Sequence, residues 1–98
     1  MEKNKPHCPL AKVLALVELG QVRATMTALS GAAAMDLEFD DMLDVVRALT
    51  TADFHKSMTT HADHRVWQDV YRRSTPVWDI YLKLTVIEDV LIVSFKEL

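Results

Sequence analysis

The sequence lacks the features that mark secreted, membrane-spanning or disulfide-linked proteins. Its 98 residues include one cysteine, Cys8, which has no partner for an internal disulfide and fits a reducing compartment. The apolar runs are short and broken by charged residues, so we expect no transmembrane helix. The first six residues have no apolar core of the kind that a signal peptide needs. We therefore expect a cytoplasmic protein without a membrane partner.

The sequence also has no excess of basic over acidic residues. The formal net charge is -3, which argues against a protein that holds nucleic acid through charge alone. The charge is unevenly placed, because residues 36–53 carry six acidic side chains and a single arginine. Residues 54–83 carry five lysines and arginines against three aspartates, with three histidines. An anion-binding site is therefore expected in the C-terminal half.

Helical signals fill the N-terminal half. Pro9 suits the first turn of a helix that Gly20 ends, and a weak alternation over residues 21–25 indicates a short strand. Thr27 is a candidate cap for a second helix through the alanine-rich stretch, and Asp40 for a third. No repeat, low-complexity tract or linker divides the chain, so we expect one domain.

After residue 50 the pattern changes to a period of two, which is typical of strands. The expected strands are residues 54–60, 66–72, 79–87 and 90–97. The helices are expected to pack on one face of a mostly antiparallel sheet, so the fold class is α+β. The single domain is expected to span residues 1–98.

The first predicted hairpin brings two polar residues together. If Thr60 lies opposite Val66, Lys56 and Gln68 are diagonal neighbours on one face of the sheet. Trp67 then lies on the opposite face, where we favour packing in the core. The role of Trp78 stays open between core packing and stacking on a base.

The last hairpin has two very different faces. If Ile87 lies opposite Val90, Tyr81 faces Lys96 and the next polar pair is Lys83 and Ser94, with Thr85 facing Ile92. The other face is wholly apolar and has to be covered. It would contain Ile80, Leu82, Leu84, Val86, Leu91, Val93 and Phe95. A sheet with one sealed face and one face of phenol and ammonium groups is a plausible platform for an anionic substrate.

Several stretches, taken in order and apparently without gaps, resemble one family. They are Gly20-Gln21-Val22-Arg23, Lys56-Ser57-Met58-Thr59-Thr60, Asp63-His64, Trp67–Arg72, Tyr81-Leu82-Lys83, Thr85-Val86-Ile87 and Asp89–Glu97. The chain resembles the MqsR-type toxins, mRNA interferases of bacterial toxin–antitoxin modules. The resemblance implies a RelE-like fold and a metal-independent endoribonuclease without a cofactor. It implies cleavage of mRNA at GC-centred triplets such as GCU, with catalytic roles for Lys56, Gln68 and Tyr81.

The resemblance also implies a partner. MqsR-type toxins are neutralised by an antitoxin with a zinc-binding N-terminal domain and a helix-turn-helix C-terminal domain. The toxin–antitoxin pair would regulate its own operon, binding operator DNA only through the antitoxin.

The three implied catalytic residues suit RNA cleavage without metal, in which the ribose 2′-hydroxyl attacks the adjacent phosphate. Such a site needs a proton acceptor, a cation near the phosphate and a donor near the leaving oxygen. Lys56 could hold the phosphate, or act as a base when desolvated. Tyr81 could donate its proton, and Gln68 could orient a base or ribose. None is an ideal acid or base at pH 7, so we expect a slow enzyme that relies on positioning.

Other charged residues extend the candidate site. Arg72, Arg73, Lys83 and Lys96 are candidate phosphate contacts, and each taken singly could equally be ordinary solubilising charge. His64 could touch the substrate or assist as an acid near neutral pH.

Two alternatives remain on the sequence alone. The acidic balance and an unusual connection at residues 73–78 favour a weak or inactive relative that only binds an antitoxin. A cluster of His55, His61, Asp63 and His64 invites a metal site, although a turn stabilised by the Asp63 carboxylate is preferred. We expect no bound metal.

Overall fold

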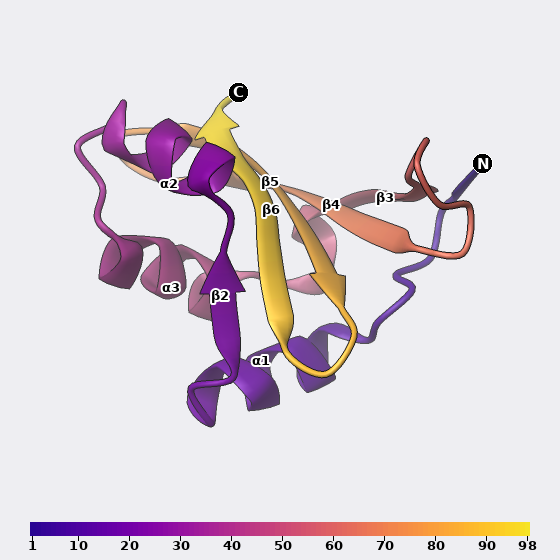
Figure 1. Ribbon diagram of the computed structural model, residues 1–98. Helices are drawn as coiled ribbons and strands as arrows, with labels where there is room; N and C mark the ends of the chain where they lie inside the picture. Colours follow the sequence, from indigo (N-terminus) through magenta and orange to yellow (C-terminus); the bar gives the residue numbers. More distant parts are fainter.

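Six strands form one sheet in the order β1-β3-β4-β5-β6-β2 in the computed structural model, which describes residues 1–98 (Figure 1). The strands are β1 (Glu2–Lys3), β2 (Val22–Ala24), β3 (Phe54–Thr59), β4 (Trp67–Ser74), β5 (Asp79–Val86) and β6 (Val90–Glu97). The helices are α1 (Leu10–Glu18), α2 (Met26–Ala33) and α3 (Phe39–Ala48), followed by a 3-10 turn, η1 (Thr51–Asp53). Only β2 and β6 pair in parallel, so the predicted α+β class with a mostly antiparallel sheet is confirmed, and the arrangement is consistent with the RelE-like class.

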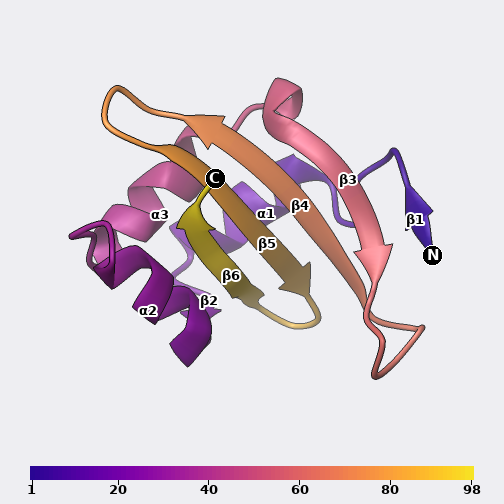
Figure 2. The ribbon, with the colours of Figure 1, turned by 90° about the horizontal axis from the view of Figure 1, so that it is seen from above.

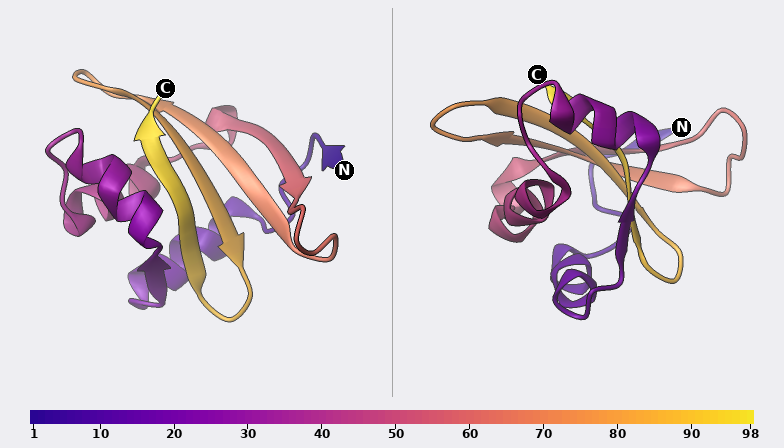
Figure 3. Two further views of the ribbon diagram at one scale, coloured as in Figure 1. Left: turned by 45° about the horizontal axis from the view of Figure 1, so that its top comes forward. Right: turned by 60° about the vertical axis from the view of Figure 1, so that its left-hand side comes forward.

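The helices α1 and α3 cover one face of the sheet, here called the core face, while α2 packs against the backbone of β6 at the edge of the sheet. In Figure 2 the strands β4 and β5 lie in front of α1, so that view looks onto the face that α1 leaves uncovered. Figure 3 shows α1 and α3 together on the other side. The fully buried core side chains include Val13, Val46, Met42, Leu82, Leu84, Ile92 and Phe95. None of the helices combines the length and hydrophobicity needed to cross a bilayer.

The predicted first helix is confirmed, and the cap of the second lies two residues earlier than expected. α1 begins directly after Pro9, and Gly20 ends it with a φ of +73°. Thr25, not Thr27, caps α2, because the Thr25 hydroxyl accepts a hydrogen bond from the Ala28 amide at 3.1 Å. Two threonines compete for this role in the sequence, and only one has the extended backbone of a cap.

The third helix also begins earlier than predicted. Glu38, not Asp40, occupies the cap position of α3. Its backbone N–H donates a 2.8 Å hydrogen bond to Asp41, forming one half of a capping box. Asp40 lies in the first turn, where its negative charge still suits the helix N-terminus.

A bulge in β6 changes the last hairpin. Val93 is an extra residue in the strand, because Leu84 pairs with Ile92 while the pairs farther from the turn keep the predicted register. Nearer the turn every pair is therefore shifted by one residue, and Thr85 lies opposite Leu91 rather than Ile92. The assignment of Leu91 and Val93 to the sealed face was wrong, and Ile92 is the residue buried there.

Replacing Gly31 with alanine is expected to lower the free energy of unfolding by about 1–3 kcal/mol. A Cβ at this position of α2 would overlap the carbonyl oxygen of Phe95 in β6. Urea unfolding would compare it with Ser30→Ala, an exposed change on the same helix, expected to stay within about 0.5 kcal/mol of the wild type. A Gly31→Ala variant more stable by the helix propensity of alanine, about 1 kcal/mol, would contradict this close approach.

Candidate functional site

Three rows of side chains cross the face of the sheet opposite the core face, here called the open face. The first row contains Glu2, Met58 and Gln68, the second Lys56, Val70, Lys83 and Ser94, and the third Arg72, Tyr81 and Lys96. Adjacent rows are two residues apart along the strands, or about 6.6 Å. Lys56, Gln68 and Tyr81 therefore lie on one face, as the predicted pairings require, with β4 between Lys56 and Tyr81.

Lys56 is held by an ion pair at the β1 side of this face. Its Nζ donates a hydrogen bond to Oε2 of Glu2 at 2.9 Å. The Lys56 side chain is 31% exposed, so solvent and solutes still reach it. The hydrogen bond and the charge of Lys56 lower the pKa of Glu2 below its ordinary value, so Glu2 is a carboxylate at neutral pH.

Tyr81 lies between two cations in the third row. Arg72 is its direct neighbour on β4, and Lys96 is its neighbour on β6. The Lys96 Nζ lies 5.1 Å from the centre of the Tyr81 ring, a cation–π contact. The half-buried phenol is therefore surrounded by charges that attract phosphate.

Val70 forms an apolar floor at the centre of the open face. It is fully buried although it does not belong to the core cluster on the other side. Lys56 lies directly opposite it on β3 and Lys83 on β5, and long lysine side chains often cover apolar surface with their stems. The centre of the site is thus apolar, with cations on either side.

Arg73, a candidate phosphate contact, does not lie on the open face with Arg72. Consecutive residues of a strand point to opposite faces, and Arg73 pairs across β5 with the buried Ile80. Its guanidinium donates a 3.2 Å hydrogen bond to Asp53 in η1. His64 is exposed in the loop between β3 and β4, outside the three rows.

The same loop is a turn stabilised by Asp63, as preferred from the sequence. The Asp63 carboxylate accepts a 2.9 Å hydrogen bond from the Arg65 backbone N–H and pairs with the Arg65 guanidinium. These contacts lower the pKa of Asp63. The structure brings no three histidine, cysteine or acidic side chains together in a way that could hold a metal ion.

Neither tryptophan lies on the open face. Trp67 is on the core side, where its ring stacks on His7 at 5.5 Å and the Lys3 Nζ lies 4.1 Å from the ring centre. The N-terminal segment therefore covers it, rather than the helices. Trp78, which the sequence left open, packs partly buried against the core.

The N-terminal segment, residues 1–8, is a part of the site that the sequence did not reveal. The buried carboxylate of Asp69 accepts hydrogen bonds from the backbone N–H groups of His7 and Cys8 at 2.9 and 3.0 Å. It also accepts one from the Ser57 hydroxyl at 2.6 Å. This anchor and the pairing of β1 with β3 bring Glu2 to Lys56. No local pattern signals it, because the contacts join residues more than fifty positions apart.

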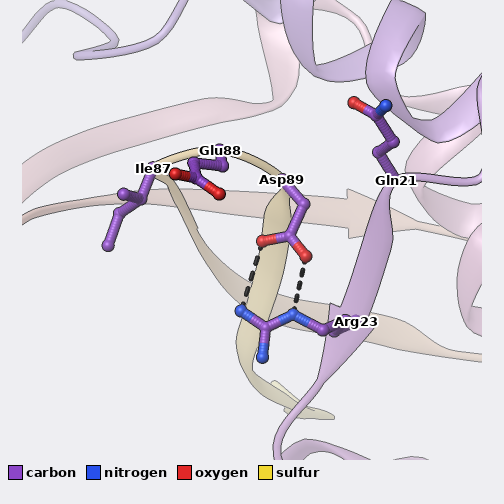
Figure 4. A pocket seen from close by; sticks show the side chains of 5 residues that line it. All are labelled: Gln21, Arg23, Ile87, Glu88 and Asp89. Atoms are coloured by element: carbon purple, nitrogen blue, oxygen red, sulfur yellow. Dashed lines mark hydrogen bonds and ion pairs between the residues drawn. The ribbon is translucent and has the colours of Figure 1, made fainter.

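A separate polar hollow of about 500 Å³ lies at the turn between β5 and β6 (Figure 4). Its Arg23 donates two hydrogen bonds to Asp89, at 2.6 and 3.2 Å. This pair lowers the pKa of Asp89 and raises that of Arg23. Because the arginine is already neutralised and the turn lies at the far end of β5 from Tyr81, the hollow does not extend the site.

Comparison with known proteins adds two findings. The family model described as "Motility quorum-sensing regulator, toxin of MqsA" matches residues 5–97. The mRNA interferase toxin MqsR of Escherichia coli (strain K12) is 55% identical over 97 residues, which cover 99% of each chain.

Replacing Asp69 with alanine is expected to lower the free energy of unfolding by several kcal/mol, because the carboxylate accepts three hydrogen bonds and a hydrogen bond to a charged group is worth about 1.5–3 kcal/mol. Hydrogen exchange at the amides of His7 and Cys8 should accelerate as the N-terminal segment loosens. Chemical unfolding and exchange would be compared with Glu88→Ala, a change at an exposed carboxylate in the last turn. Unchanged protection of both amides would show that Asp69 does not anchor the segment.

Proposed function

This chain belongs to the MqsR toxin family, and from that premise we propose that it is a metal-independent endoribonuclease that cleaves mRNA at GC-centred triplets such as GCU. The observation that supports this most is the common face of Lys56, Gln68 and Tyr81. The name of the Escherichia coli relative, an mRNA interferase toxin, supports the same activity.

In the proposed reaction the ribose 2′-hydroxyl gives its proton to solvent water, and its oxygen forms a bond to phosphorus while the bond to the 5′-oxygen breaks. The products are a cyclic phosphate and a 5′-hydroxyl. Lys56 stabilises the negative charge that grows on the phosphate oxygens. Tyr81 gives its proton to the leaving oxygen, and Gln68 orients the ribose or a base through its amide.

A local concentration of cations compensates for the net charge of -3. Lys56, Lys83, Arg72 and Lys96 all lie on the open face, whereas the acidic residues of α3 lie on the helical side. Phosphate contacts hold and orient a strand without reading its bases. RNA is therefore expected to lie across the strands of the open face rather than along the helices.

We propose further that a cognate antitoxin neutralises the protein. It would have a zinc-binding N-terminal domain and a helix-turn-helix C-terminal domain, and the pair would regulate its own operon through operator DNA bound by the antitoxin. The family description, which names the toxin of MqsA, supports such a partner. Since its substrate is mRNA, the protein would act in the cytoplasm.

An inactive antitoxin-binding relative is the second candidate, favoured by the acidic net charge. The connection at residues 73–78 gives it little support. Thr75 and Trp78 close a tight turn through a 2.7 Å backbone hydrogen bond, and Arg73 points to the core side. The connection therefore leaves the three rows of the open face intact.

Cleavage of a synthetic RNA with several GC-centred triplets should persist in EDTA, and Tyr81→Phe should slow it about 100-fold or more, the usual worth of a general acid. Lys56→Ala should have a comparable effect, because the charge on the phosphate loses its partner. The measurement is the single-turnover rate, with the cyclic phosphate ends identified by mass spectrometry.

Tyr71→Phe is the matched control for the tyrosine. Tyr71 is buried on the core side, its hydroxyl has no hydrogen-bond partner, and burial raises its pKa to about 12. Removal of the Tyr71 hydroxyl should leave both the cleavage rate and the fold unchanged. No cleavage by folded wild-type protein would favour the inactive relative, and full activity of Lys56→Ala and Tyr81→Phe would exclude this site.

Arg72→Ala should weaken binding of a 2′-deoxy analogue of the RNA and reduce its salt dependence, with the slope of log K against log salt falling by about 0.7 for one lost phosphate contact. Arg73→Ala should leave that slope unchanged, because Arg73 pairs with Asp53 on the other face. Fluorescence anisotropy at several salt concentrations separates the two neighbours. Equal changes in slope would contradict the division of the arginines between the faces.

A further inference from the structure

Glu2 is the one acidic side chain that contacts a candidate catalytic residue. A second carboxylate, Asp79, shares the open face beyond the third row, opposite Ser74, but makes no side-chain hydrogen bond or ion pair. Glu2 instead lies beside Lys56, with its Oε2 2.9 Å from Nζ. The two residues come from β1 and β3, which are paired directly.

Two sets of contacts fix the backbone around Glu2. The backbone of β1 pairs with β3, placing Glu2 opposite Met58 and Lys3 opposite Ser57. A few residues later the chain is held again by the buried Asp69. The carboxylate is thus presented by a fastened segment, although the side chain itself is 55% exposed.

A lysine ammonium group keeps a fixed position only if another group, such as a carboxylate, holds it. The flexible four-carbon stem of the side chain loses rotamer entropy when the ammonium group binds a phosphate. An ammonium has three N–H donors, so one bond to Glu2 leaves two for phosphate oxygens. The ion pair also requires the protonated lysine, which suits a phosphate-binding cation and not a general base.

We propose that Glu2 is a positioning residue for the cleavage reaction, holding the Lys56 ammonium at the β1 side of the open face so that it meets the phosphate as a fixed cation. This inference rests on the proposed function. The sequence left two roles open for Lys56, a cation that holds the phosphate and a base. With Glu2 beside it, the lysine acts through its charge rather than by taking the 2′-proton.

The test compares Glu2→Ala and Glu2→Gln in single-turnover cleavage, with Asp79→Ala as the matched change at the other carboxylate. Glu2→Ala should lower the rate at saturating RNA by about tenfold to a hundredfold, the range for a misplaced catalytic group. Glu2→Gln keeps an oxygen that accepts a hydrogen bond from Lys56, so it should recover most of this loss. Asp79→Ala should cleave like the wild type.

The background of Lys56→Ala separates positioning from a structural role. If Glu2 acts through Lys56, Glu2→Ala causes no further loss when Lys56 is already absent. A purely structural role predicts losses that multiply, together with a lower unfolding temperature in both backgrounds. Faster cleavage by Glu2→Ala would show that Glu2 competes with the phosphate, and it would overturn the proposal.

A second measurement does not depend on cleavage. Carbon-13 relaxation of the Lys56 Cε methylene should report faster and wider motion in Glu2→Ala than in the wild type. Equal mobility in the two proteins would overturn the positioning role even if the RNA is cut. Absence of cleavage by the wild type would instead overturn the proposed nuclease, and the relaxation result would still decide whether Glu2 restrains Lys56.

Discussion

The unequal faces of the sheet are the constraint on which the candidate site depends. Ile80, Leu82 and Leu84 are all buried on the core face of β5, and burial of one such side chain stabilises the fold by about 1.5–3 kcal/mol. A slip of one residue would bring all three into water. Tyr81 and Lys83 are therefore forced onto the open face. The positions of the polar groups follow from the packing of apolar ones that never meet a substrate.

The strand β4 serves both faces at once. On the core side its Asp69 holds the N-terminal segment, and on the open side Gln68 and Val70 form the middle of the site. The residues that precede this anchor form β1, which pairs with β3 at the edge of the sheet. Neighbouring residues of β4 therefore contribute to the candidate site in two ways. Gln68 and Val70 lie on the open face itself, and Asp69 anchors the segment that carries Glu2.

Local patterns predicted the parts of the structure in which neighbours in sequence are also neighbours in space. The pairing of Met58 with Gln68 and of Lys56 with Val70 follows from a short hairpin, and the sequence located it correctly. The bulge at Val93 was missed because β-branched and aliphatic residues fill both alternations of β6, so the periodicity does not choose between them. The core side of Arg73 was not predicted, because the expected strand ended at residue 72; β4 continues to Ser74, so alternation places Arg73 opposite in facing to Arg72.

Contacts between distant segments were outside the reach of such patterns. The strand β1 has two residues, too few for any periodicity, and its partner lies more than fifty residues away. The ion pair of Glu2 with Lys56 was not predicted for the same reason.

The two edges of the sheet are protected unequally, because α2 packs closely on β6 while β1 pairs with only Ser57 and Met58 of β3. The outer backbone of β3 around Lys56 has no strand partner, and a lysine on an edge strand discourages pairing with the strands of other molecules. The lysine proposed to hold a phosphate therefore also disfavours edge-to-edge aggregation of the protein.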